Sequence, residues 1–236
     1  MTTYDGKVAL VTGGARGIGF EVARQLAQSG HLVVIGARDA VRGQRAATEL
    51  QVESVVLDVS DPISVGAAAA EIQQRFGRLD VLINNAAVAP AEPAPSELAL
   101  DVLRATYETN VFGVFSVTKA FLPLLREAEA GRIVNVSSGS GSLATVSRPD
   151  WRPEWNGLAY NTSKSALNAL TVAFAVELRD TAIKINAVNP GYTATDMSPE
   201  ATRSPVLAAA LIHRFATLPE SAPSGSFHDD NGEIPW

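Results

Sequence analysis

The sequence predicts an α/β domain built on a doubly wound parallel sheet with helices on both faces. Two observations predict this fold class. Short apolar runs of strand length alternate with longer segments of helical periodicity along most of the 236 residues, as in parallel sheets covered on both faces. Several of these runs end in glycine, asparagine or serine, and in such sheets ligands bind beyond the carboxyl ends of the strands. The length suits a single domain.

The composition excludes several functional classes. Hydrophobic residues make up 46% and charged residues 19% of the chain, as in folded globular proteins. The net charge of −6 and the pI of about 5.1 argue against nucleic-acid binding, which needs clustered positive charge. The absence of cysteine excludes disulfides, thiolate metal sites and a cysteine nucleophile. We find no signal segment, membrane span or metal-ligand spacing, and expect a cytoplasmic protein without a metal.

Strand-length runs and helical repeats alternate through the first third of the chain. The run KVALVT at 7–12 is almost continuously apolar, like a strand buried on both faces. Apolar residues then recur at helical spacing in 17–29. Asp39 is placed to cap the second helix, and Asp61-Pro62 begins the third with a cap and a first-turn proline. The predicted strands are 7–12, 32–36, 54–57 and 81–83, and the predicted helices are 17–29, 40–50 and 61–76.

The alternation continues after a loop rich in proline and alanine at 89–96. Residues 138–156 are rich in Gly, Ser, Pro and Trp and predict an irregular segment, and residues 223–236 predict a final strand and tail. The predicted strands in this part are 133–136 and 183–188, and the predicted helices are 98–125 and 160–179. The polar residues that follow the strands should therefore meet at one edge of the sheet.

Tyr160 and Lys164 stand four residues apart in a predicted helix, so their side chains share one face. A lysine ammonium near a phenol favours the phenolate, and we expect it to lower the pKa of Tyr160 from its usual value of about 10. A phenol tuned in this way can act as a general acid or base. The alternative is an ordinary amphipathic helix with a tyrosine and a lysine on its wet side.

The glycine-rich stretch at 12–19 joins the first strand to the first helix. Glycines at such a turn let the backbone approach a pyrophosphate, and the helix N-terminus supplies N–H groups to it. The spacing is Gly13, Gly17 and Gly19 rather than the common GxGxxG. The alternative is a glycine-rich turn without a ligand.

The end of the second strand favours NADP(H) over NAD(H). NAD-binding proteins place an acidic residue here for the ribose hydroxyl, but this chain has Ala37 followed by Arg38. Arg38 and Arg16 can form charge-assisted hydrogen bonds with a 2′-phosphate; the alternative is two solvated arginines. Asp39 would take the acidic role in a shifted register, although we favour it as the helix cap. Asp58 is placed to meet adenine, or else simply forms a turn.

Two further polar residues stand in unusual places. Ser138 lies just beyond the fifth strand, with no histidine near it in sequence and no GxSxG motif, so a serine hydrolase gains little support. Asn110 lies inside a predicted helix, where asparagine is a poor helix former. It therefore either faces solvent or makes a hydrogen bond that the fold needs.

Taken together, these motifs resemble the short-chain dehydrogenase/reductase family over essentially the full length. The matching pieces are TGGARGIG at 12–19, NNAA at 84–87, Asn110, Ser138, YNTSK at 160–164 and NPGYTATD at 189–196. The resemblance implies one Rossmann-type NAD(P)-binding domain over 1–236, with an inserted loop at about 139–157 and a substrate loop and helix at about 192–218. Within the family the chain is most similar to the NADP-dependent carbonyl-reductase branch.

The resemblance also implies roles for individual residues. Tyr160 would be the general acid/base, Lys164 would lower its pKa and hold the nicotinamide ribose, Ser138 would orient the carbonyl, and Asn110 would complete a proton relay through water. The implied cofactor contacts are Gly13, Arg16, Gly17, Ile18 and Gly19 at the pyrophosphate, Asp58 at adenine, Asn85 at the neighbouring ribose, and Pro190, Gly191 and Thr195 at the nicotinamide end, together with Tyr160 and Lys164. Arg38 at the 2′-phosphate, argued above from the end of the second strand, completes the expected cofactor contacts.

The chain departs from the family pattern in three places. Ala87 replaces a glycine that usually follows the two asparagines. Ser138 and Tyr160 are 22 residues apart, further than is usual, and the extra segment resembles an insert found in some carbonyl reductases. Its tryptophans, Trp151 and Trp155, either form a wall of the substrate pocket or pack on the body of the domain. The region 197–218 is short for a substrate loop and helix, which predicts an open or partly unformed pocket.

Two functional hypotheses follow. The first is an NADP(H)-dependent oxidoreductase that reduces a ketone or aldehyde, or oxidises the alcohol, with NAD(H) as the alternative cofactor. The second is a catalytically silent nucleotide-binding or interaction protein on the same fold. We expect a small-molecule carbonyl or alcohol as the partner, no nucleic acid or membrane, and either a homo-oligomer (dimer or tetramer) or a monomer.

Overall fold

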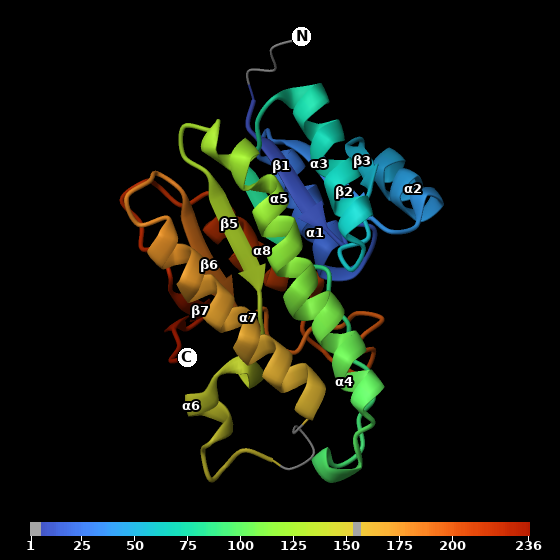
Figure 1. Cartoon of the computed structure of the whole chain (residues 1–236), viewed down its shortest axis with the longest axis vertical. Coiled ribbons are helices and arrows are strands. Elements are labelled where there is room, and N and C mark those ends of the chain that lie inside the picture. Colours follow the sequence, from blue (N-terminus) through green and yellow to red (C-terminus); the bar gives the residue numbers. More distant parts are fainter. Residues whose placement is uncertain (1–5, 153–156) are drawn as a thin grey trace.

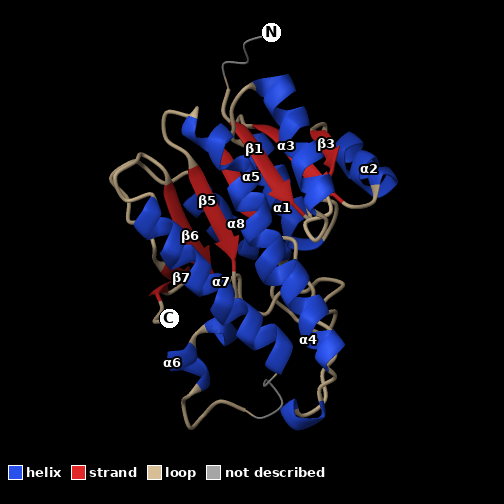
Figure 2. Cartoon of the chain, in the orientation of Figure 1, coloured by secondary structure: helices blue, strands red, loops and turns tan. Residues whose placement is uncertain are grey.

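The computed structural model describes residues 6–152 and 157–236. In these residues an eight-stranded sheet runs in the order β3-β2-β1-β4-β5-β6-β7-β8. Figures 1 and 2 show strands of this sheet with helices around them. All neighbouring strands pair in parallel except β7 and β8, which confirms the predicted fold class. The strands are β1 (Val8–Thr12), β2 (Leu32–Ala37), β3 (Glu53–Val56), β4 (Val81–Asn84), β5 (Arg132–Val136), β6 (Lys184–Val188), β7 (Phe227–Asp229) and β8 (Gly232–Glu233).

Helices cover both faces of the sheet (Figure 1). Helices α1, α2 and α8 pack with one core cluster, and α3, α5 and α7 pack with the other. The helices are α1 (Gly17–Gln28), α2 (Ala40–Leu50), α3 (Pro62–Phe76), α4 (Leu100–Tyr107), α5 (Val114–Arg126), α6 (Leu143–Val146), α7 (Leu158–Glu177) and α8 (Pro205–Ala216), with shorter turns η1 (Pro95–Glu97), η2 (Glu108–Gly113) and η3 (Gly139–Gly141). None of these helices is long and apolar enough to cross a lipid bilayer.

Strand β1 shows why the sheet is buried on both sides. Successive side chains of a strand point to opposite faces, and here Val8 and Leu10 join one core cluster while Ala9 and Val11 join the other. All four are buried. A continuous apolar run is therefore required, because neither face of the strand meets water.

The strand order places the predicted site residues at one edge. β1 lies between β2 and β4, so the chain reverses its direction of winding at the carboxyl ends of β1 and β4. A crevice opens at such a switch point. The glycine loop after β1 and Asn84-Asn85 at the end of β4 meet there, and the ends of β5 and β6 follow along the same edge.

The long helix predicted at 98–125 is helical throughout 100–126, but it is not one α-helix. Residues Glu108–Gly113 form a π-helical turn, η2, between α4 and α5. Single π turns inside helices occur frequently at functional sites. Asn110 lies in this turn and is buried, so the poor helix former marks an irregularity of the backbone.

Helix α8 forms within the substrate loop and helix predicted at about 192–218, and it packs on α1. The structure differs from the predictions in two other segments. Residues 138–156 are not wholly irregular, because η3 and the short helix α6 form within them. The C-terminal segment forms two short antiparallel strands, β7 and β8, where we predicted one. Trp151 is half-buried, whereas Trp155 lies outside the described residues.

Candidate active site

The hydroxyl groups of Ser138 and Tyr160 meet beyond the carboxyl end of β5. Ser138 is the second residue after this strand, and its Oγ shares a hydrogen bond of 2.8 Å with Ser140 Oγ. Tyr160 lies in the first turn of α7, and its phenol lies near enough to the Ser138 side chain for Ser138 to affect its pKa. Both residues are half-buried. The two segments, 22 residues apart in sequence, thus bring two hydroxyl donors to one place.

The expected lowering of the Tyr160 pKa is wrong for this structure, in which the pKa is raised. Burial raises the pKa of the Tyr160 phenol, and the nearby Ser138 side chain opposes this only in part. Burial disfavours the charged phenolate. The phenol therefore holds its proton at neutral pH, which is the state of a proton donor.

Lys164 lies one turn further along α7, on the same face as Tyr160. Its Nζ lies 5.6 Å from the centre of the Tyr160 ring and donates a hydrogen bond of 2.8 Å to the backbone oxygen of Val136, at the end of β5. The side chain is buried, and burial lowers the pKa of Lys164 to about 8. The predicted pairing of Tyr160 and Lys164 on one helix face is confirmed.

Asn110 uses its whole side-chain amide to hold neighbouring segments. Its Oδ1 accepts from the Val88 backbone N–H at 2.9 Å, and its Nδ2 donates to the Val88 carbonyl at 2.9 Å. The same Nδ2 donates to Ser163 Oγ at 3.0 Å. Asn110 therefore connects the loop after β4 to α7. Of the two alternatives for this residue, it makes hydrogen bonds within the fold and does not face solvent.

Ser163 is a site residue that we did not single out from the sequence. It is fully buried, and its hydroxyl donates to the Tyr160 carbonyl at 2.7 Å while accepting from Asn110. It thereby connects Asn110 to Tyr160. The available signal was a small hydroxyl residue one position before Lys164, on the buried face of a helix.

The glycine loop is held in place by the end of β4. Gly13 and Gly17 adopt positive φ angles of 63° and 57°, which favour glycine. Gly19 approaches Asn85 so closely that an added Cβ would lie 2.4 Å from Asn85 Nδ2. This Nδ2 donates to the carbonyls of Thr12 at 2.9 Å and Gly13 at 3.3 Å. In this structure Asn85 therefore supports the glycine loop, and a contact with ribose stays a prediction.

The N-terminus of α1 is open to a ligand. Asp39 and Asp61 cap α2 and α3 with their carboxylates, but the N-cap residue of α1 is Arg16, which makes no side-chain cap bond, and the first turn of α1 has no acidic residue. The first N–H groups of a helix need acceptors and attract anions. The loop and helix start therefore fit the pyrophosphate of a dinucleotide. Ile18 packs its side chain on the adjoining core cluster.

The loop after β6 reaches across the glycine loop. An added Cβ on Gly17 would lie 3.4 Å from Thr195 Cγ2, and Arg16 forms an exposed ion pair of 2.7 Å with Asp196. Pro190 is buried and Gly191 has a positive φ of 73°. The structure thus brings the first and last predicted cofactor segments together. Exposed pairs contribute little stability, so Arg16 is readily released to another anion.

Arg38 and Asp58 lie at the neighbouring carboxyl ends of β2 and β3. Arg38 is exposed, and within 6–152 and 157–236 its guanidinium forms no ion pair. Asp39 accepts from the Val41 and Arg42 backbone N–H groups, which confirms it as the cap of α2. Asp58 accepts from the Ser60 N–H and hydroxyl, and these bonds, with a smaller effect of nearby Arg38, lower the pKa of Asp58. Asp58 is thus a turn former here, and its contact with adenine stays a prediction.

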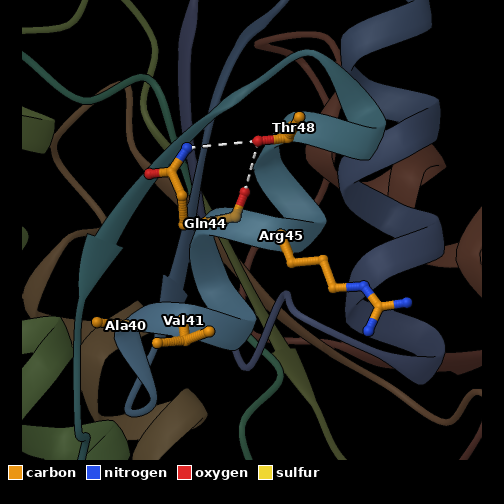
Figure 3. A pocket seen from close by; sticks show the side chains of 5 residues that line it. All are labelled: Ala40, Val41, Gln44, Arg45 and Thr48. Carbon is orange, nitrogen blue, oxygen red and sulfur yellow. Dashed lines mark hydrogen bonds between the residues drawn. The ribbon is translucent and has the colours of Figure 1, made fainter.

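A shallow hollow of about 440 Å³ lies elsewhere, along the outer side of α2 (Figure 3). Gln44 and Thr48 line it and share hydrogen bonds, and Arg45 extends beside them. The predicted acid/base residues do not line this hollow. The candidate active site is therefore identified by the side chains of Ser138, Tyr160 and Lys164, which lie close together, and not by this hollow. In the described part of the chain, no cluster of His, Asp and Glu could hold a metal ion.

Comparison with known proteins identifies similar enzymes. The family profile described as short chain dehydrogenase matches residues 7–205. The salutaridine reductase of Papaver bracteatum is 34% identical over 294 aligned positions, which include 94% of this chain and 94% of that protein. Carbonyl reductase [NADPH] 1 of Rattus norvegicus is 34% identical over 280 positions, with 98% of this chain and 99% of the rat protein covered.

A solved structure supports the same relationship. The crystal structure of the NADPH-bound carbonyl reductase from chicken fatty liver matches with a TM-score of 0.84 at 29% identity, covering 98% of both chains.

The alignment with the rat protein spans 280 positions, whereas this chain has 236 residues. The rat protein therefore contains segments that have no counterpart here.

Proposed function

Because the chain belongs to the short-chain dehydrogenase family of oxidoreductases, whose members use nicotinamide cofactors, we propose that it is an NADPH-dependent carbonyl reductase. It reduces a ketone or aldehyde to the alcohol, with Tyr160 as the general acid. The observation that carries the proposal is the convergence of the Tyr160 phenol, the Ser138 hydroxyl and the Lys164 ammonium beyond the end of β5. Acid and base groups brought together in this way are typical of catalytic sites.

Tyr160 and Ser138 act on the carbonyl oxygen of the substrate. Both hydroxyls donate hydrogen bonds to this oxygen, which becomes more negative as the reaction proceeds, and donors placed in advance stabilise that charge. The bound nicotinamide supplies the hydride that adds to the carbonyl carbon. The electron pair left on oxygen takes the Tyr160 proton, which yields the alcohol and a phenolate. Burial favours this donor role, because it keeps Tyr160 protonated.

Lys164 and Asn110 support Tyr160 in different ways. The Lys164 ammonium, 5.6 Å from the Tyr160 ring, stabilises the phenolate that remains after proton transfer. It is also placed to meet a ribose hydroxyl. Asn110 holds the loop after β4 and, through Ser163, the Tyr160 carbonyl. We assign Asn110 a positioning role, and the relay of protons through a water at this residue stays a prediction.

The preference for NADPH rests on charge near the end of β2. Exposed Arg38 and weakly paired Arg16 are available for a 2′-phosphate, while Asp39 is occupied as the cap of α2. The names of the rat and chicken relatives include NADPH. We propose the contacts of the glycine loop, Arg38, Asp58, Asn85 and the loop after β6 for the rest of the cofactor.

The substrate is proposed to be a small apolar ketone or aldehyde. Leu143 on α6, and Tyr192 and Met197 after β6, are exposed apolar side chains on the two segments that flank the site. Such side chains favour an apolar ligand. We keep two expectations from the sequence: the protein is a homo-oligomer or a monomer, and it is cytoplasmic.

Transfer of isotope tests the reaction. NADPH deuterated on the transferred face of C4 is incubated with the protein and a panel of apolar ketones and aldehydes, and products are analysed by mass spectrometry. We expect an alcohol that carries one deuterium on the former carbonyl carbon. If NADPH binds but none of the panel is reduced, the catalytically silent interpretation replaces the proposal.

A further inference from the structure

The first turn of α7, which carries Tyr160, has no cap of its own. Its N-cap residue is Gly157, which has no side chain to accept from the helix. The first N–H groups of a helix need acceptors, and a local Ser, Thr, Asp or Asn usually supplies one. Here the acceptor comes from a distant part of the chain.

Glu92 supplies both of its carboxylate oxygens to this turn. The Ala159 N–H donates to Glu92 Oε2 at 2.7 Å, and the Tyr160 N–H donates to Glu92 Oε1 at 2.9 Å. Glu92 is half-buried and precedes Ala159 by 67 residues. An added Cβ on Gly157 would lie 3.2 Å from Glu92 Oε1, so glycine leaves the carboxylate room to approach.

Tyr160 is therefore held on both sides of its peptide backbone. Glu92 accepts from its N–H, and Ser163 donates to its carbonyl at 2.7 Å. Ser163 is bonded to Asn110, which in turn grips Val88. Both connections lead back to the loop after β4, so this loop and the Tyr160 turn are joined at two points.

We propose that Glu92 is a positioning residue for Tyr160, because its carboxylate ties the loop after β4 to the first turn of α7. This proposal rests on the proposed reductase function. Glu92 acts through the backbone and does not touch the reacting atoms. Its effect is to fix the phenol opposite Ser138, and a misplacement of about 1 Å can cost about 100-fold in rate.

The first test replaces Glu92 and separates turnover from cofactor binding. Glu92→Ala removes both acceptors, and we expect kcat to fall by about tenfold or more while the Kd for NADPH stays within about twofold. Both quantities are measured well below the melting temperature, so that the variant is fully folded. A kcat within twofold of the wild-type value would overturn the proposal.

A local cap distinguishes positioning from simple helix stabilisation. In the double variant Glu92→Ala/Gly157→Asp, the new aspartate caps α7 without any connection to the loop after β4. We expect the melting temperature to recover relative to Glu92→Ala while kcat stays low. Recovery of kcat along with stability would mean that Glu92 is only a helix cap, and the proposal would be wrong.

A spectroscopic measurement reports on Tyr160 without requiring turnover. The chain has four tyrosines, and incorporation of 3-fluorotyrosine gives a ¹⁹F signal for Tyr160 that Tyr160→Phe identifies. We expect Glu92→Ala and the double variant to shift or broaden this signal. An unchanged signal in both variants contradicts positioning. If the wild-type protein reduces no carbonyl, the reductase proposal fails, but this signal still decides the role of Glu92.

Discussion

Lys164 carries a positive charge in the interior, and this lowers the stability of the fold. Its Nζ donates to the Val136 carbonyl, which is a modest replacement for water. Burial lowers the pKa of Lys164 from 10.5 to about 8, and a shift of this size corresponds to roughly 3 kcal/mol of unfavourable folding free energy. The residue is therefore retained at a cost to stability, which is common where activity depends on a buried charge.

We predict that Lys164→Met stabilises the protein while it abolishes turnover. Below pH 8 Lys164 is charged in both the folded and the unfolded protein, so its full unfavourable contribution to the folding free energy is present. Between pH 8 and 10.5 the folded protein loses this proton while the unfolded chain keeps it, so the unfavourable contribution becomes smaller and then disappears. The gain should be about 1–3 kcal/mol at pH 7 and smaller at pH 9.5. Urea denaturation at the two pH values measures it. A variant less stable than wild type at pH 7 contradicts this account.

Arg38 is the residue on which the proposed cofactor preference depends most. It is exposed and lies next to the end of β2, where a 2′-phosphate is expected. We predict that Arg38→Ala weakens NADPH binding by about tenfold or more, as expected for the loss of a charged hydrogen bond, and leaves NADH binding nearly unchanged. Calorimetric titration with both cofactors measures this. Arg45→Ala, an exposed arginine on α2 (Figure 3), is the matched control, and equal losses for both cofactors would return Arg38 to an ordinary surface role.

At the scale of elements, the glycine loop is organised by the neighbouring strand as much as by its glycines. The buried Thr12 hydroxyl donates to the Ile83 carbonyl at 3.2 Å and accepts from the Asn85 and Ala86 N–H groups, both at 3.0 Å. The Asn85 side-chain Nδ2 in turn donates a hydrogen bond to the Thr12 carbonyl. The ends of β1 and β4 are thus joined by side chains beyond the point where their ladder stops.

We predict that Thr12→Val destabilises the fold by about 1–3 kcal/mol, because the Ala86 N–H loses its acceptor while the shape is kept. The Asn85 N–H also loses its bond to Thr12 but still donates to the Ile83 carbonyl at 3.1 Å. NADPH binding should also weaken, since the glycine loop loses its support. Chemical denaturation and NADPH titration measure the two effects. Thr217→Val is the control, because Thr217 is exposed and its hydroxyl donates to the carbonyls of His213 and Arg214 at the end of α8. Equal effects of the two substitutions would contradict the special role of Thr12.

The elements that the sequence predicted best are those that leave a continuous local pattern in it. The continuous apolar run of β1 follows from burial on both faces, and Asp39 caps α2 through its own neighbours. The π turn at Asn110 could not be predicted, because contacts with Val88 and Ser163 accompany it, 22 and 53 residues away. The contact of Glu92 with α7 is equally remote in sequence.

At the scale of the whole molecule, the doubly wound order explains why widely separated motifs form one site. Parallel strands direct their carboxyl ends to one edge, so Ser138, Asn85 and Gly191 lie along that edge although 106 positions separate the last two. The positions of these residues followed from the sequence. The direction of the Tyr160 pKa shift did not, because it depends on how deeply the folded chain buries the phenol.

The central claim is that Tyr160 delivers a proton to a carbonyl while NADPH is bound. The most direct test is steady-state NADPH oxidation by the wild-type protein and by Tyr160→Phe, with a carbonyl substrate found by the isotope-transfer experiment. Each protein is also titrated with NADPH. We predict that kcat falls by at least about 100-fold in Tyr160→Phe, as expected for the loss of a general acid, while the Kd for NADPH changes by less than twofold. A Tyr160→Phe variant that turns over at the wild-type rate would contradict it.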